Sequence, residues 1–310
     1  MRNIKRNLPK KIVSKIVSKA GLLIIPFFIF VSCRSLSPVD GQRGRVAVAV
    51  SPETAVPYWQ PFAEKTLAGL AYHAGKVSSP RLEFNALRID LSNPDLRIVT
   101  AGGAAGSASD GKFLSTTISS FVRDNKLTAG MNALPFDPVS GREGEPRTNI
   151  GIVITDGVMV SPPYAPFDAL VFYADGSAAI AAQSAIHSAE NIYNAVGGFH
   201  RILEHNELAA RVLDEKARHP RSAAGISGDG RFLYLLVIDG RRPGSIGSTE
   251  AETALILRAL GAAEGINFDG GGSSALVVRC PNGKIRAVNT PIHRQIPGRE
   301  RAVAGCLGVR

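Results

Sequence analysis

The segment 267–274, with the sequence NFDGGGSS, contains the residue types that a binding or catalytic loop needs. It supplies one carboxamide, one carboxylate, three glycines and two hydroxyls: Asn267, Asp269, Gly270, Gly271, Gly272, Ser273 and Ser274. Because glycine lacks a Cβ atom, its backbone can approach a ligand closely, and successive free amides can form a concave anion site. The segment therefore predicts an anion-binding loop with Asp269 as a catalytic carboxylate, although a glycine-rich sequence after aspartate is also typical of a simple tight turn.

A second set of polar residues lies between positions 221 and 249. Arg221 provides a planar guanidinium group suited to phosphate or carboxylate, and Asp239 ends the apolar run 233–238, where partial burial can move its pKa. If this strand neighbours the strand before Asp269, both carboxylates emerge at one edge of the sheet. Two carboxyl groups flanking a bond are the usual equipment for glycoside hydrolysis. Taken singly, Asp239 also fits a plain turn and Arg221 a surface ion pair.

Several other chemistries lack their sequence motifs. The chain contains no H-E-x-x-H, C-x-x-C or G-x-S-x-G motif, so the usual zinc helix, paired-cysteine site and hydrolase serine elbow are excluded. The segment 106–112 nearly matches a nucleotide P-loop, but Phe113 follows it where magnesium binding needs a hydroxyl. The predicted chemistry requires no cofactor and no metal, and calcium in a carboxylate-rich loop stays an open alternative.

Together these motifs resemble the phosphodiester glycosidase family. The resemblance covers roughly residues 80–310 and rests on the order of five segments: 219–222, 239–241, the helix start at 247–252, 260–262 and 267–274. It implies a hydrolase that removes a sugar such as N-acetylglucosamine from a sugar-1-phosphate diester by C–O cleavage. The alternatives are a phosphodiesterase that cleaves P–O and a non-catalytic envelope lipoprotein that binds anionic glycans.

The resemblance also implies roles for individual residues. Asp269 and Asp239 are the expected catalytic groups, and the expected substrate and phosphate ligands are Asn132, Arg221, Ser222, Arg241, Thr249, Asn267 and the loop residues 270–274. Two positions depart from the family pattern. The chain has Asn132-Ala133 where Asn-Gly with two following aromatic residues is common, and Ser222 where threonine is usual. The first departure leaves the identity of the sugar open.

The N-terminal segment has the composition of an export signal. Residues 1–32 contain seven basic residues and no acidic residue, and they include the apolar run 20–31. The sequence before Cys33 resembles a bacterial lipobox, so we expect a signal peptide over 1–32, a lipidated Cys33, a tether over 33–50 and an exported protein anchored to a membrane on the periplasmic or outer surface. An ordinary secretory signal or an uncleaved anchor is the alternative. Because the formal charge of +10 is concentrated in this segment, it does not indicate nucleic-acid binding.

The remaining sequence, 51–310, predicts a single α+β domain with a mostly antiparallel mixed sheet and a few flanking helices. Four Asp-Gly or Asn-Gly dipeptides separate apolar runs, at 156–157, 175–176, 229–230 and 282–283, and such dipeptides favour tight hairpins. Helices are expected over 116–125 and 249–260, the latter with Gly261 as its stop signal. Cys280 and Cys306 could form a disulfide in an exported protein, or could be two separate buried thiols.

Overall fold

The computed structural model describes residues 60–61, 69–102, 112–139 and 142–310. They belong to one compact unit, Val48–Arg310. The expected signal peptide, lipidation at Cys33 and tether all lie outside the described residues. Within the described ranges, no helix combines the length and the apolar character needed to cross a membrane.

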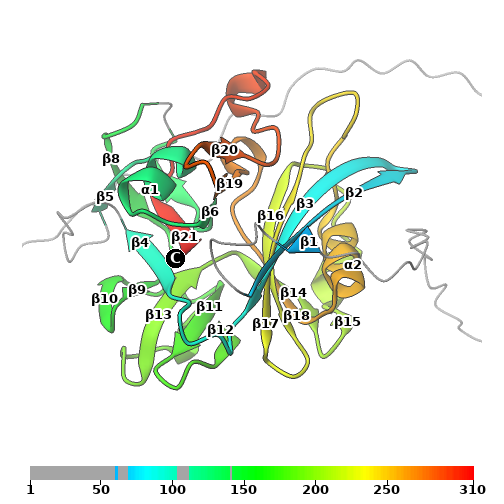
Figure 1. The fold of residues 1–310 in the computed structure, drawn as a ribbon. Coiled ribbons are helices and arrows are strands. Elements are labelled where there is room, and N and C mark those ends of the chain that lie inside the picture. Colours follow the sequence, from blue (N-terminus) through cyan, green and yellow to red (C-terminus); the bar gives the residue numbers. More distant parts are fainter. Residues whose placement is uncertain (1–59, 62–68, 103–111, 140–141) are drawn as a thin grey trace, which may run out of the picture. The chain divides into compact units, whose positions relative to one another are not determined.

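The largest sheet has eight strands (Figure 1). In spatial order the strands are β1 (Gln60–Pro61), β2 (Leu70–Ser78), β3 (Arg81–Asp90), β17 (Phe232–Ile238), β16 (Arg221–Ser227), β18 (Ala262–Asn267), β14 (His200–Glu204) and β15 (Glu207–Leu208). The sheet is buried on both faces, as the side chains of β17 illustrate. Leu233, Leu235 and Val237 join one hydrophobic cluster, whereas Leu236 and Ile238 join another, as the two-residue period of a strand requires.

Three smaller sheets complete the fold. The first contains β10 (Val158–Ser161), β9 (Val153–Thr155), β13 (Ile192–Gly197), β11 (Asp168–Tyr173) and β12 (Ala178–Ala182). The second contains β20 (Ile285–Ala287), β19 (Leu276–Arg279), β6 (Ala129–Asn132), β21 (Gly305–Val309) and β4 (Ile98–Gly102). The third contains β5 (Lys112–Leu114), β8 (Pro146–Asn149) and β7 (Phe136–Asp137). One hydrophobic cluster joins the large sheet to the first two of these, with members such as Val237, Val196 and Leu307.

The fold is mainly β, with antiparallel pairing between all the named strands that the structure describes. The described ranges contain two α-helices, α1 (Ile118–Asp124) and α2 (Glu250–Leu260), together with four short 3₁₀ turns: η1 (Gln183–Ala185), η2 (Ala210–Leu213), η3 (Gly271–Ser273) and η4 (His293–Gln295). The expectation of antiparallel structure is confirmed. The helical content is smaller than the α+β class suggests, and the strands form several sheets instead of one.

The four hairpins predicted from Asp-Gly and Asn-Gly are present. They join β9 to β10, β11 to β12, β16 to β17 and β19 to β20. In each turn the glycine has a positive φ: 78° at Gly157, 87° at Gly176, 75° at Gly230 and 80° at Gly283. Because residues with a side chain rarely adopt a positive φ, the glycines in the sequence indicate where these turns form.

Helix α2 covers one face of the large sheet, and its ends match the expected helix over 249–260 (Figure 1). Thr249 and Glu252 form a reciprocal capping box, in which each side chain accepts a hydrogen bond from the other residue's backbone N–H. The helix ends at Gly261, whose φ of 112° stops the helical conformation. This boundary places Glu250 in the first turn, beside the end of the large sheet.

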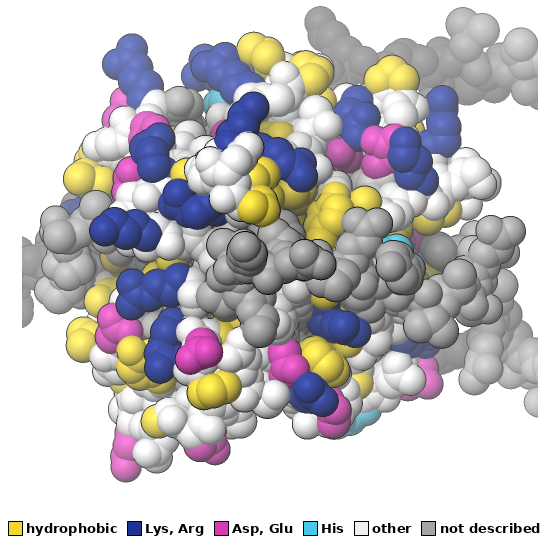
Figure 2. Space-filling model, in the orientation of Figure 1, with side chains coloured by type: hydrophobic (Ala, Val, Ile, Leu, Met, Phe, Trp, Pro, Cys, Tyr) yellow, Lys and Arg dark blue, Asp and Glu magenta, His cyan; other side chains and the backbone are white. Residues whose placement is uncertain are grey.

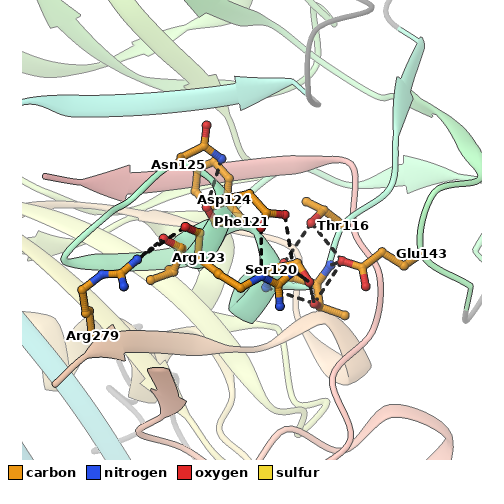
Figure 3. A network of polar contacts seen from close by, with 10 residues as sticks. Thr116, Ser120, Phe121, Arg123, Asp124, Asn125, Glu143 and Arg279 are labelled. Carbon is orange, nitrogen blue, oxygen red and sulfur yellow. Dashed lines mark hydrogen bonds and ion pairs between the residues drawn. The ribbon is translucent and has the colours of Figure 1, made fainter. Parts of the chain in front are cut away.

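Helix α1 is held at both ends by a polar network (Figure 3). At its start, Thr117 caps the helix and its backbone N–H donates to Glu143. At its end, the Arg279 guanidinium group donates to the carbonyl groups of Val122 and Leu127. The backbone N–H of Ser119 donates to Glu300, 3.0 Å away, so the start of this helix also fixes the residue before Arg301.

Candidate active site

Three strands of the large sheet bring the predicted site residues to one end. Strand β16 begins at Arg221 and pairs antiparallel with both β17 and β18, so the ends of those two strands lie beside its beginning. Asp239 follows β17, and Asp269 follows β18. The two strands are not direct neighbours, the condition considered from the sequence, because β16 lies between them, yet both aspartates follow strand ends on the same edge of the sheet. Two strand spacings separate β17 from β18, or about 10 Å.

The buried side-chain amide of Asn132 holds both ends of the glycine loop. Its Nδ2 donates to the carbonyl of Asp269 at 2.6 Å, while its Oδ1 accepts from the Ser222 hydroxyl at 2.7 Å and from the Ala275 N–H at 3.1 Å. Asn132 and Ser222 are fully buried. Both residues support the loop in this structure, and their predicted role as substrate ligands stays a prediction.

Two glycines let arginine side chains lie directly against the loop. A Cβ atom at Gly272 would be 2.6 Å from Nη2 of Arg301, and one at Gly271 would be 2.9 Å from Nη2 of Arg241. Gly271 also has a φ of 64°, which glycine adopts without strain. The glycines therefore bring two guanidinium groups against the backbone beside Asp269.

Arg241 and Arg301 have the features of an anion-binding pair. Arg241 is exposed, and its guanidinium makes no hydrogen bond or ion pair with any residue that the structure describes. Arg301 is partly buried and donates to the Ser273 hydroxyl at 3.1 Å. Burial lowers the pKa of Arg301, the Asp269 charge opposes this effect, and the nearby Arg241 charge adds to it. Two cations this close favour an anion between them.

Asp269 is the carboxylate in this region with the properties of an acid–base group. Burial raises its pKa to about 6, against the opposing effects of the Ser273 hydroxyl and the Arg301 charge. The residue is still partly exposed to solvent. Its backbone is fixed on both sides, since its N–H donates to Ala133 and its carbonyl accepts from Asn132. A carboxyl group in this state can exchange a proton near neutral pH.

Asp239, in contrast, is fully engaged in structural contacts. Its carboxylate accepts from Arg242 Nη2 at 2.6 Å, from the Thr290 N–H at 2.9 Å and from Asn289 Nδ2 at 3.2 Å. The residue is only 3% exposed. These contacts join the segment after β17 to the segment before η4, and they leave the carboxylate little freedom to react. The predicted catalytic role of Asp239 stays a prediction.

Arg221 is also occupied, and its partner is a carboxylate that sequence reasoning did not select. Its guanidinium donates to the carbonyl groups of Ser248 and Ala217 and lies 3.4 Å from Glu250 Oε1. Asn267 Nδ2 donates to the same Glu250 oxygen at 3.1 Å. Burial raises the pKa of Glu250, with the Arg221 charge opposing it. Glu250 escaped notice because an acid in the first turn of a helix is ordinary capping chemistry.

Thr249, Arg301 and His293 complete the comparison with the sequence. Thr249 caps α2 through its side chain, so its role in this structure is at the helix start, and its predicted role as a substrate ligand stays a prediction. Arg301 and His293 were missed. Arg301 Nε donates to His293 Nδ1 at 3.1 Å, and His293 is 4% exposed. The sequence signal that could have indicated them is the arginine-rich segment 294–301. This segment lies in the upper part of the view in Figure 1, and Figure 2 shows several basic side chains on that part of the surface.

The two remaining cysteines are separate. Cys280 and Cys306 are both free thiols, and β6 lies between β19, which precedes Cys280, and β21, which contains Cys306. The disulfide that the sequence left open is not formed in this structure. Among the described residues, no group of three or more His, Cys, Asp and Glu side chains is arranged to hold a metal ion.

Comparison with protein families agrees with this geometry. The model of the phosphodiester glycosidase family matches residues 125–310, which include the whole glycine loop, both flanking arginines and Glu250. The chain belongs to the phosphodiester glycosidase family. No curated protein matches the sequence.

Solved structures share the fold at low sequence identity. The catalytic domain of zebrafish N-acetylglucosamine-1-phosphodiester α-N-acetylglucosaminidase, solved in a form auto-inhibited by its pro-peptide, is 18% identical with a TM-score of 0.59, and the match covers 81% of this chain and 86% of that one. A hypothetical protein from Synechocystis is 14% identical with a TM-score of 0.59. That match covers 78% of this chain and 62% of the Synechocystis protein, so the chain spans less than two thirds of that relative's length.

The raised pKa of Asp269 predicts a pH-dependent stability. Because the folded protein favours the protonated carboxyl, stability is greatest below the ordinary value of 3.8 and is lost as the pH rises through about 6. Asp269→Asn removes this loss. Its free energy of unfolding relative to the parent should therefore rise by about 2 kcal/mol between pH 4 and pH 8.

Urea unfolding at several pH values measures this difference. Asp95→Asn removes the same charge at an exposed position and is the matched control. A difference between Asp269→Asn and the parent that is constant with pH would contradict the assigned pKa.

Proposed function

We propose that this phosphodiester glycosidase hydrolyses a sugar-1-phosphate diester, with an N-acetylglucosamine-like sugar, by cleaving the C–O bond. The observation that supports it most is the position of Asp269, with a pKa of about 6, on a glycine loop flanked by two guanidinium groups. The family match and the shared fold of the zebrafish enzyme point in the same direction.

In this proposal the loop holds the phosphodiester anion. Arg241 and Arg301 donate to its non-bridging oxygens, with support from the loop amides and from Ser273 and Ser274. Charge-assisted hydrogen bonds from guanidinium groups suit phosphate. The Ser274 hydroxyl is buried and makes no hydrogen bond with the described residues, so a donor and acceptor is available at the loop. These groups also stabilise the charge that the leaving phosphate gains.

Asp269 then acts on the sugar carbon. The anomeric carbon is one bond away from the bridging phosphate oxygen, so a carboxylate beside the phosphate site lies near it. We assign the ionised Asp269 as the group that takes a proton from the attacking water. The water oxygen bonds to the anomeric carbon, and the electron pair of the C–O bond leaves with the phosphate. Because a phosphate leaves with little need for protonation, one carboxylate is enough for this scheme. In the same scheme, Glu250 orients the sugar.

Hydrolysis in heavy-oxygen water tests the bond that breaks. With an N-acetylglucosamine phosphodiester as substrate, the label is expected in the anomeric hydroxyl of the released sugar, as mass spectrometry of both products will show. Label in the phosphate instead would replace C–O cleavage by the P–O-cleaving alternative. Tight binding of phosphodiester glycans without any turnover would support the non-catalytic alternative.

Substitution at the two aspartates tests the residue assignment. Asp269→Asn should lower kcat by about 100-fold or more. In the parent, kcat/KM should rise with pH through about 6, because Asp269 works in its ionised form. Asp239→Asn breaks the contacts to Arg242 and Asn289 and should lower the melting temperature while the rise in kcat/KM stays at the same pH. Full activity of Asp269→Asn, or a shifted pH profile in Asp239→Asn alone, would reverse the assignment.

We also propose that the protein is exported and anchored by lipid at Cys33, to act on phosphodiester-linked glycans of the cell envelope. The basic segment, the apolar run 20–31 and the residues before Cys33 support this. In a bacterial host, the full chain should partition with membranes and incorporate radiolabelled palmitate, and Cys33→Ala should lose the label. Equal labelling of Cys33→Ala would refute lipidation at this residue.

A further inference from the structure

A group of aromatic rings lies at the same end of the large sheet as the candidate active site. Phe167 is at its centre, with ring centroids 4.8 Å from Tyr164, 5.2 Å from Phe199 and 5.4 Å from His200. We call Tyr164, Phe167, Phe199 and His200 the aromatic wall. Tyr164 is 45% exposed and the other three are partly exposed, and none of the four belongs to the hydrophobic core clusters. Rings that are fixed yet partly open to solvent can bind a ligand.

Strand pairing places this wall next to the polar residues of the site. The Phe199 N–H donates to the carbonyl of Asn267 at 2.8 Å, and His200 is the cross-strand partner of Asn267. Directly opposed residues of antiparallel strands extend their side chains on the same face, about 5 Å apart. His200 and Asn267 are therefore neighbours, and Asn267 in turn contacts Glu250.

Two polar atoms on these neighbouring side chains have no partner. Asn267 is 1% exposed, and its Oδ1 accepts no hydrogen bond from the described residues. The buried Nδ1 of His200 is likewise without a partner among them. Because a buried polar atom left unpaired destabilises the protein, the pair is expected to meet a ligand with hydrogen-bonding groups.

The charge around this pair favours a neutral polar ligand. Burial lowers the pKa of His200, the Arg211 charge adds to this effect, and Asp168 opposes it, so the ring is neutral at pH 7. Arg211 also acts on Glu250, which places the two residues in one electrostatic neighbourhood. The free Arg241 and the loop-bound Arg301 lie instead beside the glycine loop. At the aromatic end, the charges of Arg211 and Arg221 are balanced by Glu250 and Asp168, whereas at the anion end two arginines face the carboxylate of Asp269.

The wall is also held rigidly. The fully buried Gln183 accepts from the N–H groups of Ile152 and Tyr164, and its own backbone N–H donates to Phe167. Asp168 accepts from the Arg201 N–H at 2.7 Å, which fixes the start of β14 beside Phe167. Because these contacts fix the backbone from which the rings extend before any ligand binds, less conformational entropy is lost on binding.

We propose that the aromatic wall, with Asn267 and His200, is the subsite for the sugar ring. The apolar C–H face of a pyranose packs against Phe167 and Phe199, and a hydroxyl or acetamido N–H donates to Asn267 Oδ1. This inference rests on the proposed function, because it gives the sugar end of the same phosphodiester. The phosphate end remains at Arg241 and Arg301.

Binding measurements without turnover test the subsite. Titration calorimetry compares N-acetylglucosamine 1-phosphate with inorganic phosphate on the parent and on two variants. Phe167→Leu keeps an apolar side chain but removes the flat ring, and His200→Phe keeps the ring but removes Nδ1. Each variant should bind the sugar phosphate about 10-fold more weakly and bind inorganic phosphate as the parent does, which also shows that it is folded.

Two substitutions away from the wall are matched controls. Tyr193→Leu removes a ring that is 45% exposed on β13, and His205→Phe changes a histidine just after β14 whose side chain is 87% exposed. Both should bind the sugar phosphate as the parent does. The subsite is overturned if Phe167→Leu and His200→Phe also bind it unchanged, or if the parent binds it no more tightly than inorganic phosphate.

The binding outcome separates this proposal from the proposed function. If the sugar phosphate binds through the wall but the diester is never hydrolysed, the subsite stands and the glycosidase activity fails. If the diester is hydrolysed while the two wall variants keep the parent's KM and binding affinity, the activity stands and the subsite fails.

Discussion

The site depends on one buried amide, the side chain of Asn132. It lies at the end of β6, in a different sheet from β16 and β18, and its three hydrogen bonds connect Asp269, Ser222 and Ala275. Since a buried amide without its partners costs free energy, these bonds specify one position for the loop. Asn132 thus joins two sheets at the point where Asp269 follows β18, and the flanking arginines contact the backbone that it fixes.

Around this point the charges separate into two parts. Near the glycine loop, the two positive charges of Arg241 and Arg301 outnumber the one negative charge of Asp269. The net positive charge favours an anion there. Near the start of α2, Arg221 and Glu250 largely neutralise one another, with Asn267 as an additional donor. A substrate with one charged end and one neutral end fits this division. The aromatic wall then continues the neutral part across β14.

Local patterns in the sequence predicted the local structure well. The four turn dipeptides and the Thr249 and Gly261 boundaries depend on residues close in sequence, so the hairpins and α2 could be foreseen. The site was only partly predictable. Asp269 stands out because of its glycines, but the surroundings of Asp239 and Glu250 depend on tertiary contacts. Arg242 donates a hydrogen bond to Asp239. Burial raises the pKa of Glu250, although the charge of Arg221 opposes this. No spacing along the chain indicates such long-range pairing.

The segment 289–309 contributes to several parts of the molecule at once. Asn289 and Thr290 hold Asp239, Arg301 lies against the glycine loop, and β21 fills the gap between β6 and β4. During synthesis on the ribosome, β6 therefore waits for a strand made more than 170 residues later. The segment that completes this sheet thus also brings Arg301 to the glycine loop. A nascent chain without it lacks both Arg301 and β21, the strand between β6 and β4, so the surroundings of Asp269 and the pairing of β6 depend on the same late-made residues.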